Sequence, residues 1–79
     1  MYNESMKIRE LDNVALKHNM SDDEVTLSAG TVGTVVHKYG RANVFEVEFM
    51  DAVGTTVGVV TLKASDLRPL GKDDMLYAK

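Results

Sequence analysis

One stretch of the chain alternates strictly between apolar and polar residues. In VFEVEFM, residues 44–50, the apolar residues Phe45, Val47 and Phe49 alternate with two glutamates. Successive side chains of a β-strand point to opposite faces, so this pattern predicts a strand with one buried face and one solvated face. We expect the two glutamates, Glu46 and Glu48, on the solvated face.

The segments on either side of this strand are rich in β-branched residues, which resist helix formation and fit a pleated sheet. They are TVGTVVHKY, residues 31–39, and TVGVVTL, residues 56–62. The connections GRAN and DAVGT contain glycine with Asn or Asp, as turns between paired strands do. The pattern therefore predicts three neighbouring strands joined by two hairpins.

Adjacent apolar residues interrupt the alternation in both flanking segments. The pattern does not decide which of Val35 and Val36 points inward, and at Val59 and Val60 it indicates a bulge or burial on both faces. Gly33 predicts a bulge or a sharp bend near the start of its strand. The expected core consists of five apolar residues: Val35, Phe45, Val47, Phe49 and Leu62.

The chain before these strands contains one short strand and one long loop. The segment LDNVAL, residues 11–16, contains turn-forming residues near its start and closely spaced apolar residues. This composition is typical of a short strand. Residues 17–30 are polar, are acidic at their centre and lack the apolar period of a helix. We expect this segment to be a loop that ends at Gly30.

The chain after these strands contains a single turn and a last short strand. Ala64-Ser65-Asp66 favours one helical or 3-10 turn, capped by Ser65 or Asp66. Residues 67–70 (LRPL) predict a brief strand, which Pro69 confines to an edge or to short pairing because proline cannot donate a backbone hydrogen bond.

This order of elements predicts an all-β fold, a small five-stranded SH3-like barrel with a long first loop and a 3-10 turn before the last strand. The alternative is an OB-like barrel, which usually needs longer strands and a helix between the third and fourth. We divide the chain into an N-terminal extension (1–10), the barrel (11–70) and a C-terminal tail (71–79).

Composition narrows the class of protein. A chain of 79 residues with 44% apolar and 27% charged residues corresponds to one globular domain. It contains no cysteine, which excludes disulfides and thiolate zinc ligands, and its net charge of -3 argues against a protein that mainly neutralises phosphates. No apolar stretch follows the charges of the first ten residues, so we expect no signal peptide and a cytoplasmic location.

Four motifs carry a resemblance to a known family: MKIRELDNVAL, AGTVGTVVHKYG, FEVEFMDAVGTTVGVVTL and LRPL. From Met6 to Leu70 the chain resembles a family of short bacterial proteins, a domain of unknown function. This resemblance implies an SH3-like fold, and small proteins of this kind are often suspected antitoxins or immunity partners. Gly30, Gly33 and Val35 also resemble, more loosely, the entry of KOW-type modules of the ribosome and of transcription.

The residue pattern offers no catalytic or metal-binding constellation. His18 and His37 lie in different elements without the further ligands that a zinc site requires. No serine stands in a G-x-S-x-G elbow, and nothing around Glu46 and Glu48 provides the pocket that acid–base catalysis needs. We therefore expect a protein that is not an enzyme and that uses no cofactor or metal.

Two classes of binding module remain open. The first is a protein-interaction module of antitoxin, immunity or adaptor type, in which the acidic loop residues Asp22, Asp23 and Glu24 contact a basic partner protein. The second is a weak nucleic-acid-binding, KOW-like module, in which Tyr39 and Arg41 provide an aromatic ring beside positive charge. The turn from Tyr39 to Arg41 is also the second candidate for a protein contact.

Overall fold

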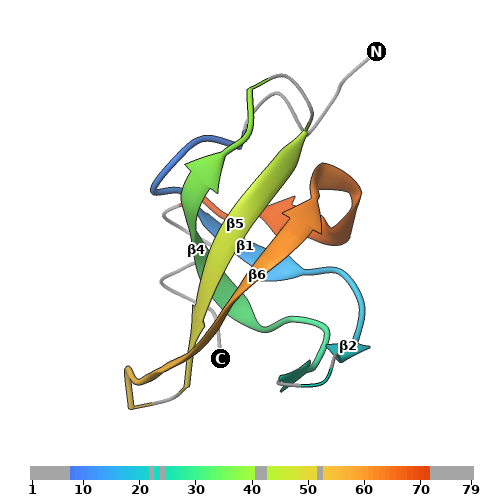
Figure 1. Ribbon diagram of the computed structural model, residues 1–79, viewed down its shortest axis with the longest axis vertical. Helices are drawn as coiled ribbons and strands as arrows, with labels where there is room; N and C mark the ends of the chain where they lie inside the picture. The colour runs from blue at the N-terminus through green and yellow to red at the C-terminus, as the bar shows by residue number, and fades with distance from the viewer. Residues whose placement is uncertain (1–7, 22, 24, 41–42, 52, 72–79) are drawn as a thin grey trace.

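The structure, a computed structural model, describes residues 8–21, 23, 25–40, 43–51 and 53–71 (Figure 1). These residues form short β-strands and one 3-10 turn, so the all-β prediction is confirmed. The elements in chain order are β1 (Asn13–Leu16), β2 (Met20–Ser21), β3 (Thr26–Leu27), β4 (Val32–Lys38), β5 (Val44–Met50), β6 (Thr56–Lys63), η2 (Ala64–Asp66) and β7 (Leu67–Pro69).

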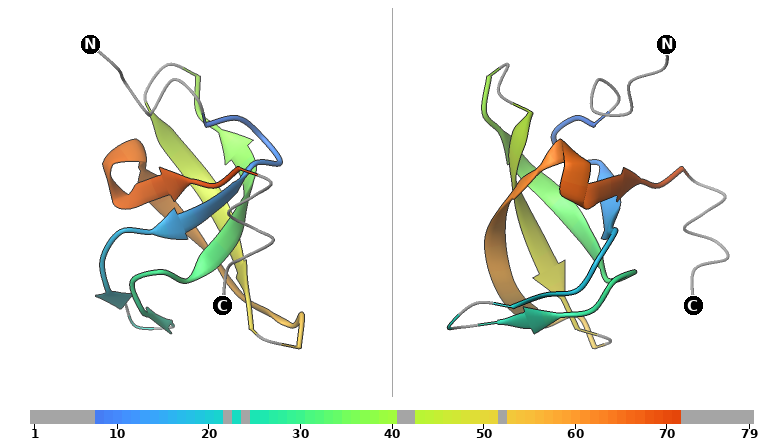
Figure 2. Two further views of the ribbon diagram at one scale, coloured as in Figure 1. Left: turned by 180° about the vertical axis from the view of Figure 1, so that it is seen from behind. Right: turned by 90° about the vertical axis from the view of Figure 1, so that its right-hand side faces the viewer.

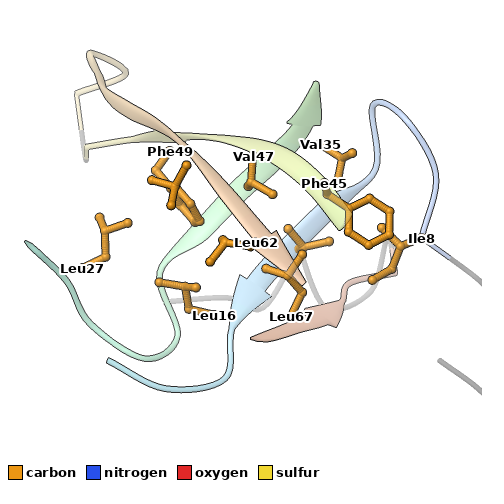
Figure 3. Packing of buried hydrophobic residues seen from close by; sticks show 11 residues of the cluster. Ile8, Leu16, Leu27, Val35, Phe45, Val47, Phe49, Leu62 and Leu67 are labelled. Atoms are coloured by element: carbon orange, nitrogen blue, oxygen red, sulfur yellow. The ribbon is translucent and has the colours of Figure 1, made fainter. Parts of the chain in front are cut away.

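Five of the strands form one antiparallel sheet in the order β6-β5-β4-β1-β7, and β2 and β3 form a separate two-stranded hairpin. Figure 2 shows that the five-stranded sheet is strongly twisted, so that β1 and β7 cross over β5 and β6. The buried apolar side chains fill the space between the half of the sheet that contains β1 and β7 and the half that contains β5 and β6 (Figure 3).

The first strand begins two residues later than expected, because Leu11 cannot take part in an extended strand. Its φ of 72° is left-handed, and it lies in a turn in which the Asp12 backbone N–H donates to Arg9 O over 3.1 Å. The Asp12 carboxylate also accepts the Arg9 backbone N–H at 2.9 Å. These bonds turn the chain before Asn13, where β1 begins.

The expected long loop, residues 17–30, contains the hairpin of β2 and β3, which the sequence analysis missed. Met20 pairs with Leu27 and Ser21 with Thr26. Leu27 is 7% exposed and belongs to the core, against which Met20 and Val25 pack. Strands of two residues are too short to produce a hydrophobic period, so only the packing of these side chains reveals them.

The bulge in β4 lies at Val36 and not at Gly33. The pairing of β4 with β5 is regular at Gly33 and shifts between Val35 and His37. Val35 is consequently fully buried, while Val36 is 42% exposed. A bulge inserts one residue and so restores the alternation after two adjacent apolar residues.

The second irregularity lies in β6 at Val57, where the pairing with β5 shifts between Phe49 and Met50. At Val59 and Val60 the pairing is regular, contrary to the bulge or two-sided burial expected there. Val60 faces the core at 9% exposure and Val59 faces solvent at 54%.

Gly33 leaves space for two core side chains, which any larger residue at position 33 would displace. A Cβ atom at this position would lie 2.7 Å from Val47 Cγ1 and 2.8 Å from Phe49 Cδ1. The glycine therefore serves close packing between β4 and β5, since its conformation is not left-handed.

All five residues of the predicted core are buried. The other buried apolar residues of the cluster are Ile8, Val14, Leu16, Leu27, Val60 and Leu67. Ile8, at 0% exposure, lies in the segment that we separated from the barrel as an N-terminal extension. A single apolar residue between charged neighbours carries no periodic signal, so its burial could not be predicted from the sequence.

The 3-10 turn η2 forms where the sequence predicted it. The Asp66 carboxylate accepts the backbone N–H of Lys63 at 3.0 Å, which identifies Asp66 and not Ser65 as its capping side chain. The strand that follows, β7, pairs with β1 over three residues, as expected for a strand that contains Pro69.

Candidate functional site

The two candidate surfaces from the sequence lie at opposite ends of the molecule. Asp23 is exposed at the tip between β2 and β3, and Tyr39 directly follows β4. Figures 1 and 2 show the β2–β3 hairpin at one end and the β4–β5 connection at the other. Asp22, Glu24 and Arg41 lie outside the described residues.

The outward side of β4, β5 and β6, here called the outer face, carries a ladder of polar side chains. The pairing places Glu46 of β5 between His37 and Thr61, and it places Glu48 between Thr34 and Val59. Because alternate residues of a strand share a face, both glutamates lie on the side opposite Phe45, Val47 and Phe49. They occupy the central strand of this part of the sheet, as expected from the alternation.

Glu46 is held in place by two hydroxyl groups. The Tyr39 hydroxyl donates to Glu46 Oε2 at 2.6 Å, and the Thr61 hydroxyl donates to the same oxygen at 2.8 Å. The carboxylate of Glu48 accepts the Thr56 hydroxyl at 3.1 Å in the same way. Because these donors are neutral hydroxyl groups, they orient both carboxylates without neutralising their negative charge.

These contacts set the protonation states on the outer face. The hydrogen bonds from Tyr39 and then Thr61 lower the pKa of Glu46, with a smaller contribution from His37 and against the effect of burial. The hydrogen bond to Glu46 and burial raise the pKa of Tyr39. At neutral pH, Glu46 is therefore a carboxylate and Tyr39 a hydroxyl donor.

No lysine or arginine within the described part of the chain lies within ion-pair distance of Glu46 or Glu48. The other oxygen of each carboxylate, Oε1, accepts no hydrogen bond from a described residue. The outer face therefore presents two oriented negative charges that are not paired with a described lysine or arginine.

The Tyr39 ring stands beside this ladder and is 43% exposed. Its partner on β4 is His37, whose ring lies edge-on to it with centroids 4.5 Å apart. Nδ1 of His37 lies 3.5 Å from Glu10 Oε2, which brings a third carboxylate to the same part of the surface. An exposed aromatic ring beside carboxylates is suited to contact with a cationic, partly apolar surface.

The sequence pattern indicates Tyr39 as part of a candidate surface, whereas for Glu46 and Glu48 it predicts only a solvated strand face. The hydrogen bonds of Glu46 join β5 to Thr61 of β6 and to Tyr39 after β4, which become neighbours only when the hairpins are in register. Aligning residues 44–50 with residues 56–62 as a hairpin would have placed a threonine opposite each glutamate or near it. That alignment is the signal that was available in the sequence.

The described residues contain no group of three or more His, Asp or Glu side chains that could hold a metal ion. They also include no helix with the length and apolar character needed to span a membrane. The arrangement that the structure does provide is a fixed, negatively charged surface.

Comparison of the chain with curated proteins and with solved structures found no match. Residues 10–69 match a domain of unknown function, DUF4926. The matched region covers every element from β1 to β7 and includes Tyr39, Glu46 and Glu48. The chain therefore belongs to the DUF4926 family of domains of unknown function.

Proposed function

We propose that the chain is a non-enzymatic protein-interaction module, of antitoxin, immunity or adaptor type, whose outer face binds a basic protein. The observation that carries this proposal is the pair Glu46 and Glu48, oriented by hydroxyl groups and not paired with a described lysine or arginine. A bacterial, cytoplasmic setting is part of the expectation from the sequence.

We further propose that the fold is an SH3-like barrel. The strand order β6-β5-β4-β1-β7, the hairpin within the first long connection and the 3-10 turn before β7 support this assignment. The crossing of the two halves of the twisted sheet also supports it (Figure 2). Small barrels of this type present their strands as a rigid surface, which suits binding by shape and charge.

The spacing of the two glutamates favours an extended basic segment as the bound element. Residues two apart on a strand are about 7 Å apart, which is also the spacing of alternate side chains on a partner strand. Arginine or lysine at alternate positions could therefore reach both carboxylates through their free Oε1 atoms. The exposed Tyr39 ring and Val59, at 43% and 54% exposure, would contact the apolar part of the same segment.

The acidic loop at the other end of the molecule is the second candidate surface. Its described residue, Asp23, is exposed. We favour the outer face because its carboxylates stand on paired strands and are fixed by hydrogen bonds, so less side-chain freedom is lost on binding.

Neutralising the outer face should weaken binding to a basic peptide. For the double variant Glu46→Gln and Glu48→Gln, we expect association with a peptide of alternating arginine and valine to be about ten-fold slower at low salt. The difference should shrink as salt screens the charges. Glutamine still accepts the hydroxyl hydrogen bonds, so the melting temperature should change little. Biolayer interferometry with the immobilised peptide measures the rate.

The matched control neutralises the acidic loop, with Asp22→Asn, Asp23→Asn and Glu24→Gln in one variant. We expect this variant to associate at nearly the wild-type rate. If the loop variant shows the larger loss, the contact surface is the loop. Equal losses in both variants would mean that the peptide responds only to net charge, and the outer-face proposal would be wrong.

Nucleic acids should bind weakly. The hydroxyl of Tyr39 is bonded to a carboxylate, and a third carboxylate, Glu10, lies near His37, so phosphates would be repelled where a base could stack. We expect dissociation constants on the order of 10⁻⁴ M or weaker for duplex DNA and structured RNA at physiological salt. Fluorescence anisotropy of labelled oligonucleotides measures them. Micromolar, salt-sensitive binding that is lost in Arg41→Ala would instead favour the KOW-like alternative.

A further inference from the structure

A second polar cluster joins the segment after β1 to the 3-10 turn η2. His18 Nε2 lies 2.8 Å from Asp66 Oδ1, and His18 Nδ1 lies 3.1 Å from the backbone oxygen of Asn19. The other carboxylate oxygen of Asp66 accepts the Lys63 backbone N–H at 3.0 Å. Here the two nitrogens of one imidazole face two acceptors that are far apart in the sequence.

Only the protonated ring can satisfy both acceptors. A neutral imidazole carries one N–H, and neither the Asn19 carbonyl nor an ionised Asp66 can donate a proton to the second nitrogen. The Asn19 carbonyl and then Asp66 raise the pKa of His18, against a smaller effect of burial. Burial by itself would raise the pKa of Asp66, but the hydrogen bonds from Lys63 and His18 together lower it.

A neighbouring cation favours the ionised form of Asp66. Lys63, at the start of η2, stabilises the Asp66 carboxylate, whereas Lys17, which precedes His18 in the chain, has the same sign of charge as protonated His18. Asp66 is the charged group that acts on His18 among the described residues. Besides the adjacent Asn19 carbonyl, the protonation of His18 thus depends on Asp66 of η2, which lies 48 positions away in the sequence.

The same residues hold the base of the segment 17–30, which contains the β2–β3 hairpin. The Lys17 backbone N–H donates to Asp66 O at 2.9 Å. The Asn19 side chain accepts the Ala29 backbone N–H at 2.8 Å, which joins the two ends of the segment. The contacts of Lys17 and His18 with Asp66 therefore connect η2 to the first end of the hairpin segment, and the bond between Asn19 and Ala29 connects that end to the other.

We propose that protonated His18 clasps the hairpin segment 17–30 to η2, and that loss of this proton loosens the segment that carries Asp23. Because the folded-state pKa of His18 is raised, the clasp is fully present below the unfolded value of about 6.5 and is lost as the pH rises through the higher folded value. Because the pKa of Asp66 is lowered, the carboxylate persists until the pH falls below about 3.8. The clasp is therefore lost as the pH rises above about 6.5, and it goes beyond the proposed function because it concerns the segment that carries Asp23 and not the outer face.

Amide hydrogen exchange in the ¹⁵N-labelled full chain tests the clasp. The Ala29 amide reports on the hairpin base, and the Gly54 amide, bonded to Asp51 O at 3.0 Å in the β5–β6 turn, is the internal reference. After correction for intrinsic exchange, we expect Ala29 protection relative to Gly54 to fall about two- to five-fold between about pH 5.5 and pH 8, the range expected for an exposed ion pair.

Two variants separate the clasp from a general loss of stability. In Asp66→Asn, which can still accept the Lys63 N–H, His18 should titrate at lower pH than in the wild type, as followed by its ring carbon resonances. In His18→Gln the ratio of Ala29 to Gly54 protection should no longer depend on pH. A wild-type ratio that stays constant while His18 titrates, or an unchanged pH dependence in His18→Gln, would overturn the proposal.

Discussion

Replacing Phe49 with alanine should lower the free energy of unfolding by about 3–5 kcal/mol. Phe49 is fully buried, and its neighbours on β4 and β6 are the glycines Gly33 and Gly58. Neither glycine has a side chain that could move into the cavity left by the ring. The loss should therefore lie toward the upper end of that range, since the cost of a cavity depends on how far the site can collapse.

Denaturant unfolding followed by circular dichroism measures this loss, with Met50→Ala as the matched control. Met50 is the next residue of β5 but is 42% exposed, so its truncation should cost no more than about 1 kcal/mol. For a domain of this size, whose total stability is on the order of 5–10 kcal/mol, the Phe49 variant should lose a large part of that stability and unfold at a much lower denaturant concentration. A midpoint unchanged from the wild type would mean that Phe49 does not fill the core.

Adding a single methyl group at Gly33 should destabilise the protein by about 1–3 kcal/mol. In Gly33→Ala the new Cβ would lie 2.7 Å from Val47 Cγ1 and 2.8 Å from the Phe49 ring, distances at which one side must shift. Both neighbours are fully buried and cannot move into solvent. The strain from such overpacking is distributed over the β4–β5 pair. Thermal unfolding measures the resulting loss of stability.

Gly58→Ala is the matched control for this variant, because it adds the same atom on the other side of Phe49. The nearest side-chain atom to a Cβ at Gly58 is 4.0 Å away, in Val25, so no clash is expected. Its effect should be within about 1 kcal/mol of the wild type. If Gly33→Ala is equally mild, the close approach of β4 to Val47 and Phe49 is not as tight as the structure has it.

The two large effects should not add. In the double variant Gly33→Ala and Phe49→Ala, the ring that opposes the new methyl group is gone. The measured loss should therefore be smaller than the sum of the two single losses by about 0.5–3 kcal/mol, the range for residues in contact. Simple additivity would show that the two positions do not share one packing site.

Parts of the candidate site follow from local sequence and parts do not. Tyr39 was identified because an aromatic residue stands beside basic ones at a turn, and the alternation assigned Glu46 and Glu48 to the solvated face. The hydrogen bonds of Glu46 do not follow from the local pattern, because the donors, Tyr39 after β4 and Thr61 of β6, meet Glu46 only in the paired sheet. The ion pair of His18 with Asp66 likewise joins two residues that are far apart in the sequence.

The sequence by itself determined the elements whose side chains carry a period or a strong local preference. The bounds of β5, the β-branched strands beside it and the 3-10 turn at residues 64–66 all follow from such patterns. These features depend on neighbours along the chain, because alternation and turn preference are properties of consecutive residues.

Only the tertiary structure decided which of two adjacent valines is buried, where the bulges lie and which isolated residues join the core. Val35 faces inward because the extra residue of the bulge falls at Val36, and that position is set by the pairing with β5. Ile8 and Leu27 are buried because distant strands leave room for them, although nothing in their own segments marks them. Elements pack through contacts between residues that are far apart in sequence. The order of apolar and polar residues along the chain does not indicate which of these contacts form.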